Sequence, residues 1–301
     1  MKKLLFWLQC TRAYALPMSI TAWIIPFSLG YFNHGKILYG FLALAGIIFA
    51  HLGANLFDDI IDYKSFLKNK KENDAINLKK GKCKYFIDNE LKLSTACKVS
   101  AVLFLMAIAI GMFFVFVYKL PVLILMAITG ILCLLYPKSG YYGLSEILIG
   151  IIFSPLLFTG VYYVMTGAFS QKLEWMSISF AIVTVTLLYT DFFLDFNSDK
   201  KDGKKTLAII SGSKQNAYYF YMFLIFLVYA NIFLGIHAHV FSMKYLIIFF
   251  SMFYALKTVG NLQYFLDKEI KDEKEFMSTM NDVQKFIAIF AALCVTAFYI
   301  G

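Results

Sequence analysis

The sequence is short of charged residues. Only 16% of its 301 residues are Asp, Glu, Lys or Arg, whereas 60% are hydrophobic; soluble domains carry about 25% charged residues. This shortage excludes an ordinary soluble domain and indicates a membrane protein with many spans, whose length is set by the span number. The excess of Lys and Arg (28) over Asp and Glu (19) then indicates basic cytoplasmic loops, and we expect no nucleic-acid partner.

Two other patterns are missing. None of the five cysteines forms a Cys-x-x-Cys pair, so the sequence predicts neither a disulfide framework nor a zinc site. The alternation of polar and apolar residues that marks a membrane β-barrel is absent, so we expect an all-α chain. The first residues, Met1–Leu8, have too short an apolar core for a signal peptide and predict a helix lying on the cytoplasmic membrane surface.

Long apolar stretches fill the rest of the chain. There are nine, each near the ~20 residues that a helix needs to cross ~30 Å of hydrocarbon. The predicted spans are 16–33, 37–57, 99–118, 120–137, 145–166, 175–194, 216–236, 244–265 and 284–300.

The distribution of lysine predicts the orientation. The connections after spans 1, 3, 5 and 7 are short and carry one lysine each. Ten lysines lie between Lys64 and Lys98, after span 2, and five between Lys200 and Lys214, after span 6. The positive-inside rule therefore places the N-terminus and the even-numbered connections in the cytoplasm.

Two acidic stretches end apolar runs on this predicted cytoplasmic side. Asn55-Leu-Phe-Asp58-Asp59-Ile-Ile-Asp62 closes span 2, and a stretch containing Asp191, Asp195, Asp199 and Asp202 closes span 6. Asp191 and Asp195 follow Asn55 and Asp59 at the same interval. We expect the two stretches to face each other across one cavity. The interval also suggests that spans 1–4 and 5–8 are similar halves; convergent placement of acids at helix ends is the alternative.

The spacing of these acids predicts a cation site. On a helix Asn55, Asp59 and Asp62 share one face, and Asp191, Asp195, Asp199 and Asp202 also share one. Unpaired carboxylates in a partly buried setting cost several kcal/mol. Magnesium, which accepts one or two carboxylates together with substrate phosphates, would offset that cost. The alternative is that the acids are solvated helix ends paired with nearby lysines.

Both stretches resemble known motifs. Asn55–Asp62 is similar to the first Asn-x-x-x-Asp-x-x-Asp motif of the UbiA superfamily of intramembrane aromatic prenyltransferases, and Asp195–Ala208 resembles its second motif, in the form of the 1,4-dihydroxy-2-naphthoate polyprenyltransferase branch. Arg12–Pro17 and Gly143–Glu146 also agree. The chain departs from that branch at Asp191 and Leu194, where Asn and Arg are usual, and these departures concern the aromatic acceptor.

The resemblance implies a fold and an activity. It implies about nine helices around a central cavity, a single prenyltransferase domain over residues 1–301, and a place in the cell inner membrane. It implies Mg²⁺-dependent transfer from a polyprenyl diphosphate to an aromatic acceptor, best matched by 1,4-dihydroxy-2-naphthoate in menaquinone biosynthesis. The other acceptors to consider are a 4-hydroxybenzoate-like phenol, a porphyrin and a glycerol phosphate.

The resemblance also implies residue roles. The implied metal ligands are Asn55, Asp59, Asp62, Asp191, Asp195 and Asp199, of which Asp59, Asp62, Asp195 and Asp199 bridge the metal to the diphosphate. The candidate diphosphate-binding cations are Lys204, Lys205, Lys138 and Lys68. For Lys204 and Lys205 the alternative is the ordinary positive-inside distribution of lysine, and for Lys68 it is contact with lipid headgroups.

Four further polar residues have less definite predicted roles. His51, one turn before Asn55, is a candidate for the acceptor pocket, as Asn55 itself is; the alternative for His51 is a hydrogen-bonded interior histidine. Asp58 either contacts the metal ligands from outside the metal sphere or faces the lysine-rich connection. Asp202 ends the second stretch. Lys257 lies inside span 8, where a charge is a functional candidate or pairs within the bundle.

A different class of function also fits paired membrane carboxylates. A cation-coupled secondary transporter uses such groups, but near the bilayer midplane and often at broken helices. Here the acids lie at the ends of spans beside basic loops, which favours the transferase.

Overall fold

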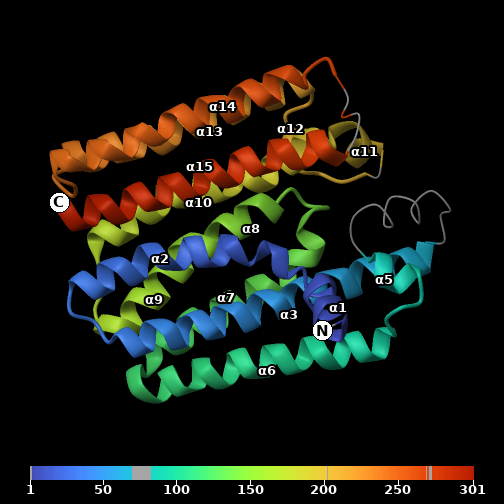
Figure 1. Cartoon of the computed structure of the whole chain (residues 1–301), viewed down its shortest axis with the longest axis horizontal. Coiled ribbons are helices and arrows are strands. Elements are labelled where there is room, and N and C mark those ends of the chain that lie inside the picture. Colours follow the sequence, from blue (N-terminus) through green and yellow to red (C-terminus); the bar gives the residue numbers. More distant parts are fainter. Residues whose placement is uncertain (1, 70–82, 202, 269, 271–272) are drawn as a thin grey trace. The chain divides into compact units, whose positions relative to one another are not determined.

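The computed structural model describes every residue except 1, 70–82, 202, 269, 271 and 272. Within this part of the chain all regular elements are helical and no strand occurs (Figure 1). The described residues are thus all-helical, as predicted, and nine of their helical segments are long and apolar enough to cross a membrane. They are Ala13–Phe32, Ile37–Lys68, Leu93–Tyr118, Leu120–Ser139, Ser145–Thr166, Gln171–Leu194, Lys214–His237, Met243–Tyr264 and Glu273–Ile300.

The chain forms two compact units. Unit 1 comprises Met1–Ile20 and Phe41–Pro137, and unit 2 comprises Thr21–Gly40 and Lys138–Gly301. Helices α2 (Leu16–Phe32) and α3 (Ile37–Asn69) each pass from one unit to the other.

Unit 1 builds its core around α3. Its other elements are α1 (Lys2–Cys10), η1 (Ala13–Ala15), α5 (Lys84–Ile87), α6 (Leu93–Tyr118) and α7 (Leu120–Ser139). One buried apolar cluster includes Cys10 of α1, Leu56 and Ile60 of α3, Phe86 of α5 and Ala96 of α6. Burial of such side chains contributes about 1.5–3 kcal/mol each for the larger ones. The cluster therefore fixes α1 and α5 against the part of α3 that carries the first acidic stretch.

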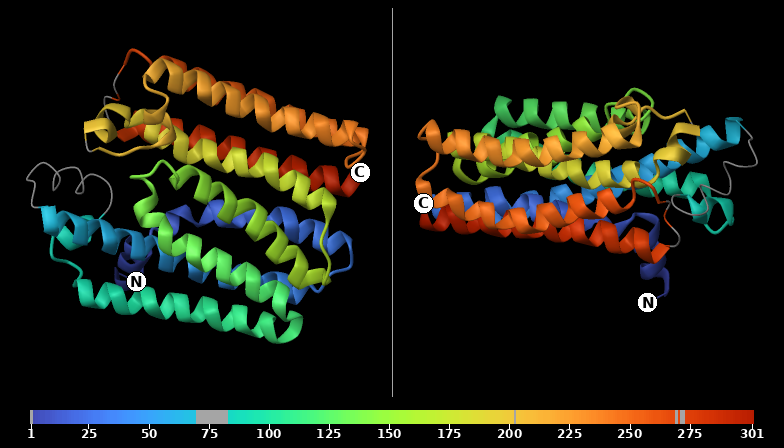
Figure 2. Two further views of the ribbon diagram at one scale, coloured as in Figure 1. Left: turned by 180° about the vertical axis from the view of Figure 1, so that it is seen from behind. Right: turned by 90° about the horizontal axis from the view of Figure 1, so that it is seen from above.

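Unit 2 is organised around α10 (Gln171–Leu194), which packs against α13 (Lys214–His237) and α15 (Glu273–Ile300) (Figures 1 and 2). Asn231 of α13 donates hydrogen bonds to the Trp175 carbonyl (3.1 Å) and to the Ser179 hydroxyl (2.8 Å) of α10. The elements that follow α7 are α8 (Ser145–Ile151), η2 (Ile152–Leu156), α9 (Leu157–Thr166), α10, α11 (Phe196–Lys201), α12 (Leu207–Ile210), α13 (Lys214–His237), η3 (Met243–Ser251), α14 (Met252–Tyr264) and α15 (Glu273–Ile300).

Span 5 contains a local change of helix type. Between α8 and α9, residues Ile152–Leu156 form a π turn that includes Pro155. Proline has no amide hydrogen to donate, which favours a departure from the regular α-helical ladder. The Ser154 hydroxyl donates to the Ser177 carbonyl of α10 at 2.6 Å, so the turn is packed against the central helix of the unit.

Several helices extend beyond the predicted spans. Helix α3 continues to Asn69, although its apolar part was predicted to end at residue 57; α6 begins at Leu93 and α15 at Glu273. Hydropathy marks where apolar residues stop, whereas a helix continues through polar residues as long as its backbone hydrogen bonds are made. At 1.5 Å per residue the 33 residues of α3 measure about 50 Å, more than the ~30 Å of hydrocarbon in a bilayer.

Candidate active site

The first acidic stretch lies inside α3 and not at its end. Asp58 and Asp59 are buried, with 4% and 1% of their surfaces exposed, while Asn55 and Asp62 are half-buried. Since an ionised carboxylate is costly to bury without a partner, each buried aspartate requires compensating groups.

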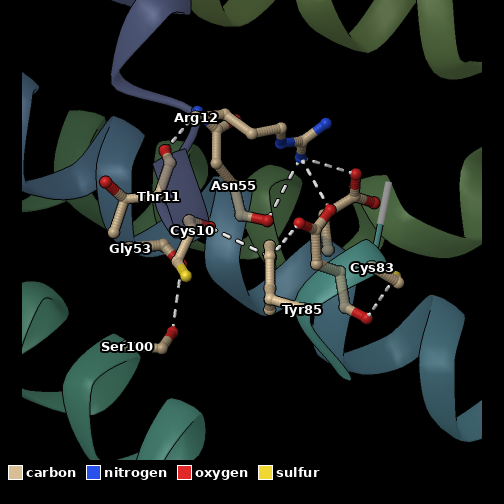
Figure 3. A network of polar contacts seen from close by, with 10 residues as sticks. Cys10, Thr11, Arg12, Gly53, Asn55, Cys83, Tyr85 and Ser100 are labelled. Atoms are coloured by element: carbon tan, nitrogen blue, oxygen red, sulfur yellow. Dashed lines mark hydrogen bonds and ion pairs between the residues drawn. The ribbon is translucent and has the colours of Figure 1, made fainter. Parts of the chain in front are cut away.

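Arg12 supplies the positive charge for this stretch. Its Nη2 donates to Asp58 Oδ2 at 2.9 Å, lies 3.5 Å from Asp59 Oδ1 and donates to the Asn55 carbonyl at 3.1 Å (Figure 3). Arg12 follows α1 in a left-handed backbone conformation, with φ of 52°. Burial disfavours the charged guanidinium, but the carboxylates of Asp59 and Asp58 outweigh it and raise the pKa of Arg12.

Tyr85 of α5 contacts Asp59 from the other side. Its hydroxyl is within hydrogen-bond reach of the Asp59 carboxylate and of the Cys10 carbonyl, the latter at 3.0 Å (Figure 3). The Cys83 thiol donates to the Asp59 backbone carbonyl at 3.1 Å. Burial, reinforced by the negative charge of Asp59, raises the pKa of Tyr85, so its hydroxyl keeps its proton at neutral pH. Burial and Asp59 likewise raise the pKa of the Cys10 thiol to about 12.

The second acidic stretch spans a helix break, which corrects the expected single helix over Asp191–Asp202. Helix α10 ends at Leu194, Asp195 lies at the break, and α11 begins at Phe196. The backbone N–H of Asp195 still donates to the Asp191 carbonyl (3.1 Å), and that of Asp199 donates to the Asp195 carbonyl (2.9 Å). Asp191, Asp195 and Asp199 therefore remain on neighbouring turns.

Lys204 supplies the positive charge in this stretch. Its Nζ lies 2.6 Å from Asp199 Oδ1, and Asp199 is only 4% exposed. Asp195 is more accessible. Partial desolvation raises the pKa of Asp195, the negative charge of Asp199 adds to the increase, and Lys204 opposes it.

Glu146 at the start of α8 anchors the segment that follows the second stretch. It is fully buried, and its carboxylate accepts hydrogen bonds from the Leu207 N–H and the Ser145 hydroxyl, both at 2.8 Å. The Lys205 N–H donates to the Gly140 carbonyl at 3.0 Å. These bonds attach the chain around Lys204 and Lys205 to the connection between α7 and α8.

Gly143, in the connection between α7 and α8, is expected to tolerate a larger residue poorly because it packs closely against the Lys205 backbone. Its φ is +74°, and a Cβ there would lie 2.9 Å from the Lys205 carbonyl oxygen. We expect Gly143→Ala to reduce the free energy of unfolding by about 2 kcal/mol, the order of the left-handed penalty for a non-glycine residue. Thermal unfolding in detergent measures it. The matched control is Gly160→Ala in α9, where a Cβ meets nothing within 4 Å; equal stability of both variants would contradict this account.

Among the described residues, the other three lysines predicted to bind diphosphate form no ion pair with the acidic stretches. Lys68, Lys138 and Lys205 are exposed, and within the described residues none forms an ion pair with a carboxylate. Their diphosphate-binding roles stay predictions. Asp202 lies outside the described residues.

His51 and Lys257 have identified partners. The Nδ1 atom of His51 lies 2.5 Å from the Ser19 hydroxyl, so the ring is held by a neighbouring helix; its acceptor-pocket role stays a prediction. Lys257 pairs with Asp282 of α15 at 2.9 Å, and Asn261 donates to the same carboxylate at 3.1 Å. Lys257 is therefore paired within the bundle of unit 2.

Sequence reasoning did not select Arg12, Tyr85 or Glu146 as site residues. Arg12 and Glu146 belong to the patches that carried the resemblance, and a cation directly before an apolar span was a usable signal for Arg12. Tyr85 gave no local signal, because it lies among lysines and its contact with Asp59 arises only from the packing of α5.

The oxygen donors fit magnesium. Among the described residues no group of three or more His, Cys, Asp or Glu side chains is close enough to hold a metal by itself. Magnesium does not need such a cage, since one or two carboxylates, waters and substrate phosphates complete its octahedron. Two features of the fold fit this mode: both stretches present carboxylates, and in each a buried aspartate already lies beside a cationic side chain.

Comparison with known proteins gives a family match. The model of the UbiA prenyltransferase family matches residues 18–290. The UbiA prenyltransferase domain-containing protein 1 of Gallus gallus is 26% identical over 240 residues, which cover 74% of this chain and 68% of that protein. The 1,4-dihydroxy-2-naphthoate octaprenyltransferase of Haemophilus influenzae is 24% identical over 227 residues, which cover 72% of this chain and 73% of that protein.

A solved structure shares the fold. The structure of a UbiA homologue from Archaeoglobus fulgidus bound to DMAPP and Mg²⁺ aligns with a TM-score of 0.66 at 13% identity. The alignment covers 98% of this chain and 99% of that one.

Proposed function

Because this chain belongs to the UbiA prenyltransferase family, we propose that it transfers a polyprenyl group from a polyprenyl diphosphate to an aromatic acceptor, with Mg²⁺ as cofactor. Membership of this family makes the protein an enzyme, so the alternative of a cation-coupled secondary transporter is dropped. The acceptor that we propose is 1,4-dihydroxy-2-naphthoate, in menaquinone biosynthesis. The Haemophilus influenzae relative and the form of the second motif support this choice.

One observation carries the proposal. In each acidic stretch a nearly inaccessible aspartate, Asp59 or Asp199, lies beside a basic side chain, Arg12 or Lys204. An arrangement of buried carboxylates with adjacent cations suits a diphosphate bound through a divalent metal, because the metal binds the carboxylates while the cations face the phosphate oxygens.

We propose that each stretch supplies ligands for magnesium ions. Asn55, Asp59 and Asp62 would supply them from α3, and Asp191, Asp195 and Asp199 from α10, the break after it and α11. Bound magnesium would neutralise the charge that develops on the leaving diphosphate. Lys204 would add a hydrogen-bond donor to the same oxygens; Lys205, Lys138 and Lys68 are further candidates for this task.

The proposed reaction breaks one bond and makes one. The C–O bond of the donor cleaves with its electron pair leaving on the diphosphate, which gives an allylic cation. An electron-rich carbon of the aromatic ring attacks this cation. Loss of a proton, or of carbon dioxide with a naphthoate acceptor, then restores aromaticity. The apolar helices would shelter the prenyl tail and keep water from the cation.

We also propose a single prenyltransferase domain over residues 1–301, with its active site open to the cytoplasm and its place in the inner membrane. The family match over residues 18–290 supports the single domain, and the lysine distribution supports the orientation. The similarity of spans 1–4 and 5–8 stays a prediction.

The orientation has a direct test. An odd number of crossings, such as the nine candidate spans among the described residues, would put Arg12 and Gly301 on opposite sides of the membrane, so we expect residue Gly301 on the outer face. Alkaline phosphatase fused after Gly301 should be active in a bacterial host, and a green fluorescent protein fused there should be dark. A bright fluorescent fusion together with an inactive phosphatase fusion would show that Gly301 lies in the cytoplasm and would overturn the proposed orientation.

The activity is tested with purified protein in detergent. The assay supplies Mg²⁺, a polyprenyl diphosphate and a panel of aromatic acceptors, and mass spectrometry detects the prenylated product while released diphosphate is measured. We expect product with 1,4-dihydroxy-2-naphthoate and a loss of at least about 100-fold on chelation with EDTA, reversed by excess Mg²⁺.

The outcomes separate the parts of the proposal. Product formed only with another acceptor would overturn the assignment of 1,4-dihydroxy-2-naphthoate as the acceptor, but the proposed prenyl transfer would stand. Failure with every acceptor, together with donor binding that survives both Asp59→Ala and Asp195→Ala, would overturn the proposed reaction.

A further inference from the structure

The Tyr85 hydroxyl faces two acceptors at once. One is the carboxylate of Asp59, the proposed metal ligand, and the other is the Cys10 carbonyl at the end of α1 (Figure 3). A phenol has one hydrogen to donate. Tyr85 can therefore give a full hydrogen bond to the carboxylate or to the carbonyl, but not to both.

The ring of Tyr85 is held in place independently of this choice. Its centroid lies 4.8 Å from that of Phe86, which in turn stacks on Tyr63 of α3 at 5.0 Å. Phe86 belongs to the buried cluster that joins α1, α3, α5 and α6. The hydroxyl therefore stays beside both acceptors when its hydrogen turns from one to the other.

The Asp59 carboxylate is held from two sides. Asp59 is 1% exposed and lies between the Tyr85 hydroxyl and the Arg12 guanidinium, whose Nη2 is 3.5 Å from Oδ1. These neighbours fix its orientation on the helix. A ligand whose orientation is fixed by hydrogen bonds from outside the metal sphere binds its metal more tightly than a mobile one.

Resting on the proposed function, we propose that Tyr85 is a positioning residue for the metal. Without metal its hydroxyl donates to Asp59 and fixes the orientation of the carboxylate before a cation binds. When the carboxylate binds the cation, the hydroxyl can turn to the Cys10 carbonyl, so no buried donor is left without an acceptor. Tyr85 itself does not touch the metal, the donor or the acceptor.

The test is Tyr85→Phe, which keeps the ring and removes the hydroxyl. We expect the Mg²⁺ concentration for half-maximal activity to rise about 10–100-fold, the range known for outer partners of metal ligands. The kcat at saturating Mg²⁺ should stay within about threefold of the wild type. Mn²⁺ binding in the presence of a thiolo-diphosphate analogue of the donor, followed by electron paramagnetic resonance, should weaken by a similar factor without any turnover.

The matched control is Tyr229→Phe in α13. The Tyr229 hydroxyl makes a buried hydrogen bond of 2.8 Å to Ser251 of η3, and neither residue belongs to an acidic stretch. This variant loses an equivalent hydrogen bond, so its thermal stability should fall by a similar amount while its Mn²⁺ affinity remains that of the wild type.

Each result decides the question. Wild-type protein that binds no Mn²⁺ with the analogue would refute the proposed function itself. If the wild type binds and Tyr85→Phe binds equally well, the positioning role is rejected while the function stands. A Tyr85→Phe protein that cannot be purified folded, or that loses kcat at saturating Mg²⁺ with unchanged metal affinity, also overturns the role.

Discussion

Asp59→Asn is expected to reduce prenyl transfer by at least about 100-fold, more than the loss of an outer partner of a metal ligand. The substitution removes the negative charge that we propose to bind magnesium, but asparagine keeps an oxygen that can accept from Tyr85. The protein should therefore fold and lose its activity. Product formation at saturating donor, acceptor and Mg²⁺ measures the effect, and thermal unfolding confirms that the variant is folded.

Asp282→Asn is the matched control for this substitution. Asp282 of α15 is also largely buried and also paired with a cation, Lys257 of α14, but neither residue belongs to an acidic stretch. Its replacement should change activity by less than about threefold. Activity of Asp59→Asn within the same range would contradict a metal-binding role for Asp59.

The second large effect is expected for Arg12→Met. Removing the guanidinium takes the Arg12 ion pair from the buried Asp58 and Asp59 and a donor from the Asn55 carbonyl. Breaking a buried ion pair from one side costs about 3–5 kcal/mol. We therefore expect the free energy of unfolding to fall by that amount, measured as a lowered denaturation midpoint in detergent or a loss of folded protein on expression.

The physical reason is tested by a second substitution. In the double variant Arg12→Met/Asp58→Asn one of the two buried carboxylates that lost the Arg12 ion pair becomes neutral, so this variant should be more stable than Arg12→Met alone. Lys257→Met should cost no more than about 1 kcal/mol, since the Lys257 side chain is 56% exposed. A double variant less stable than Arg12→Met would show that lost packing, and not the lost ion pair, causes the effect.

The nine spans could be predicted from the sequence because each rests on a local property. A run of about 20 apolar residues must form its backbone hydrogen bonds internally in lipid, and a helix does so whatever its neighbours are. The two acidic stretches were also evident, because charges that directly follow such runs are conspicuous. The family resemblance, carried by the same residues, is confirmed by the match over residues 18–290.

The environment of those acids could not be predicted in the same way. The contact of Tyr85 with Asp59 depends on α5 folding back on α3, and that of Glu146 with Leu207 joins segments far apart in the chain. Such tertiary contacts leave no periodic pattern. The break at Asp195 was missed because spacing arguments assume an uninterrupted helix, whereas the backbone there leaves helical geometry for one residue.

The π turn at Ile152–Leu156 has a consequence for the register of span 5. One extra residue in a turn rotates everything before it by about 100° relative to everything after it, since an α-helix advances by that angle per residue. Glu146 can therefore face the Leu207 amide while the α9 end of the same span keeps its own packing surface. Deleting one residue of this turn would rebuild a regular helix and rotate Glu146 away from its partner. In span 5 the length of the chain, and not only its composition, determines which side chains reach the segment that follows the second acidic stretch.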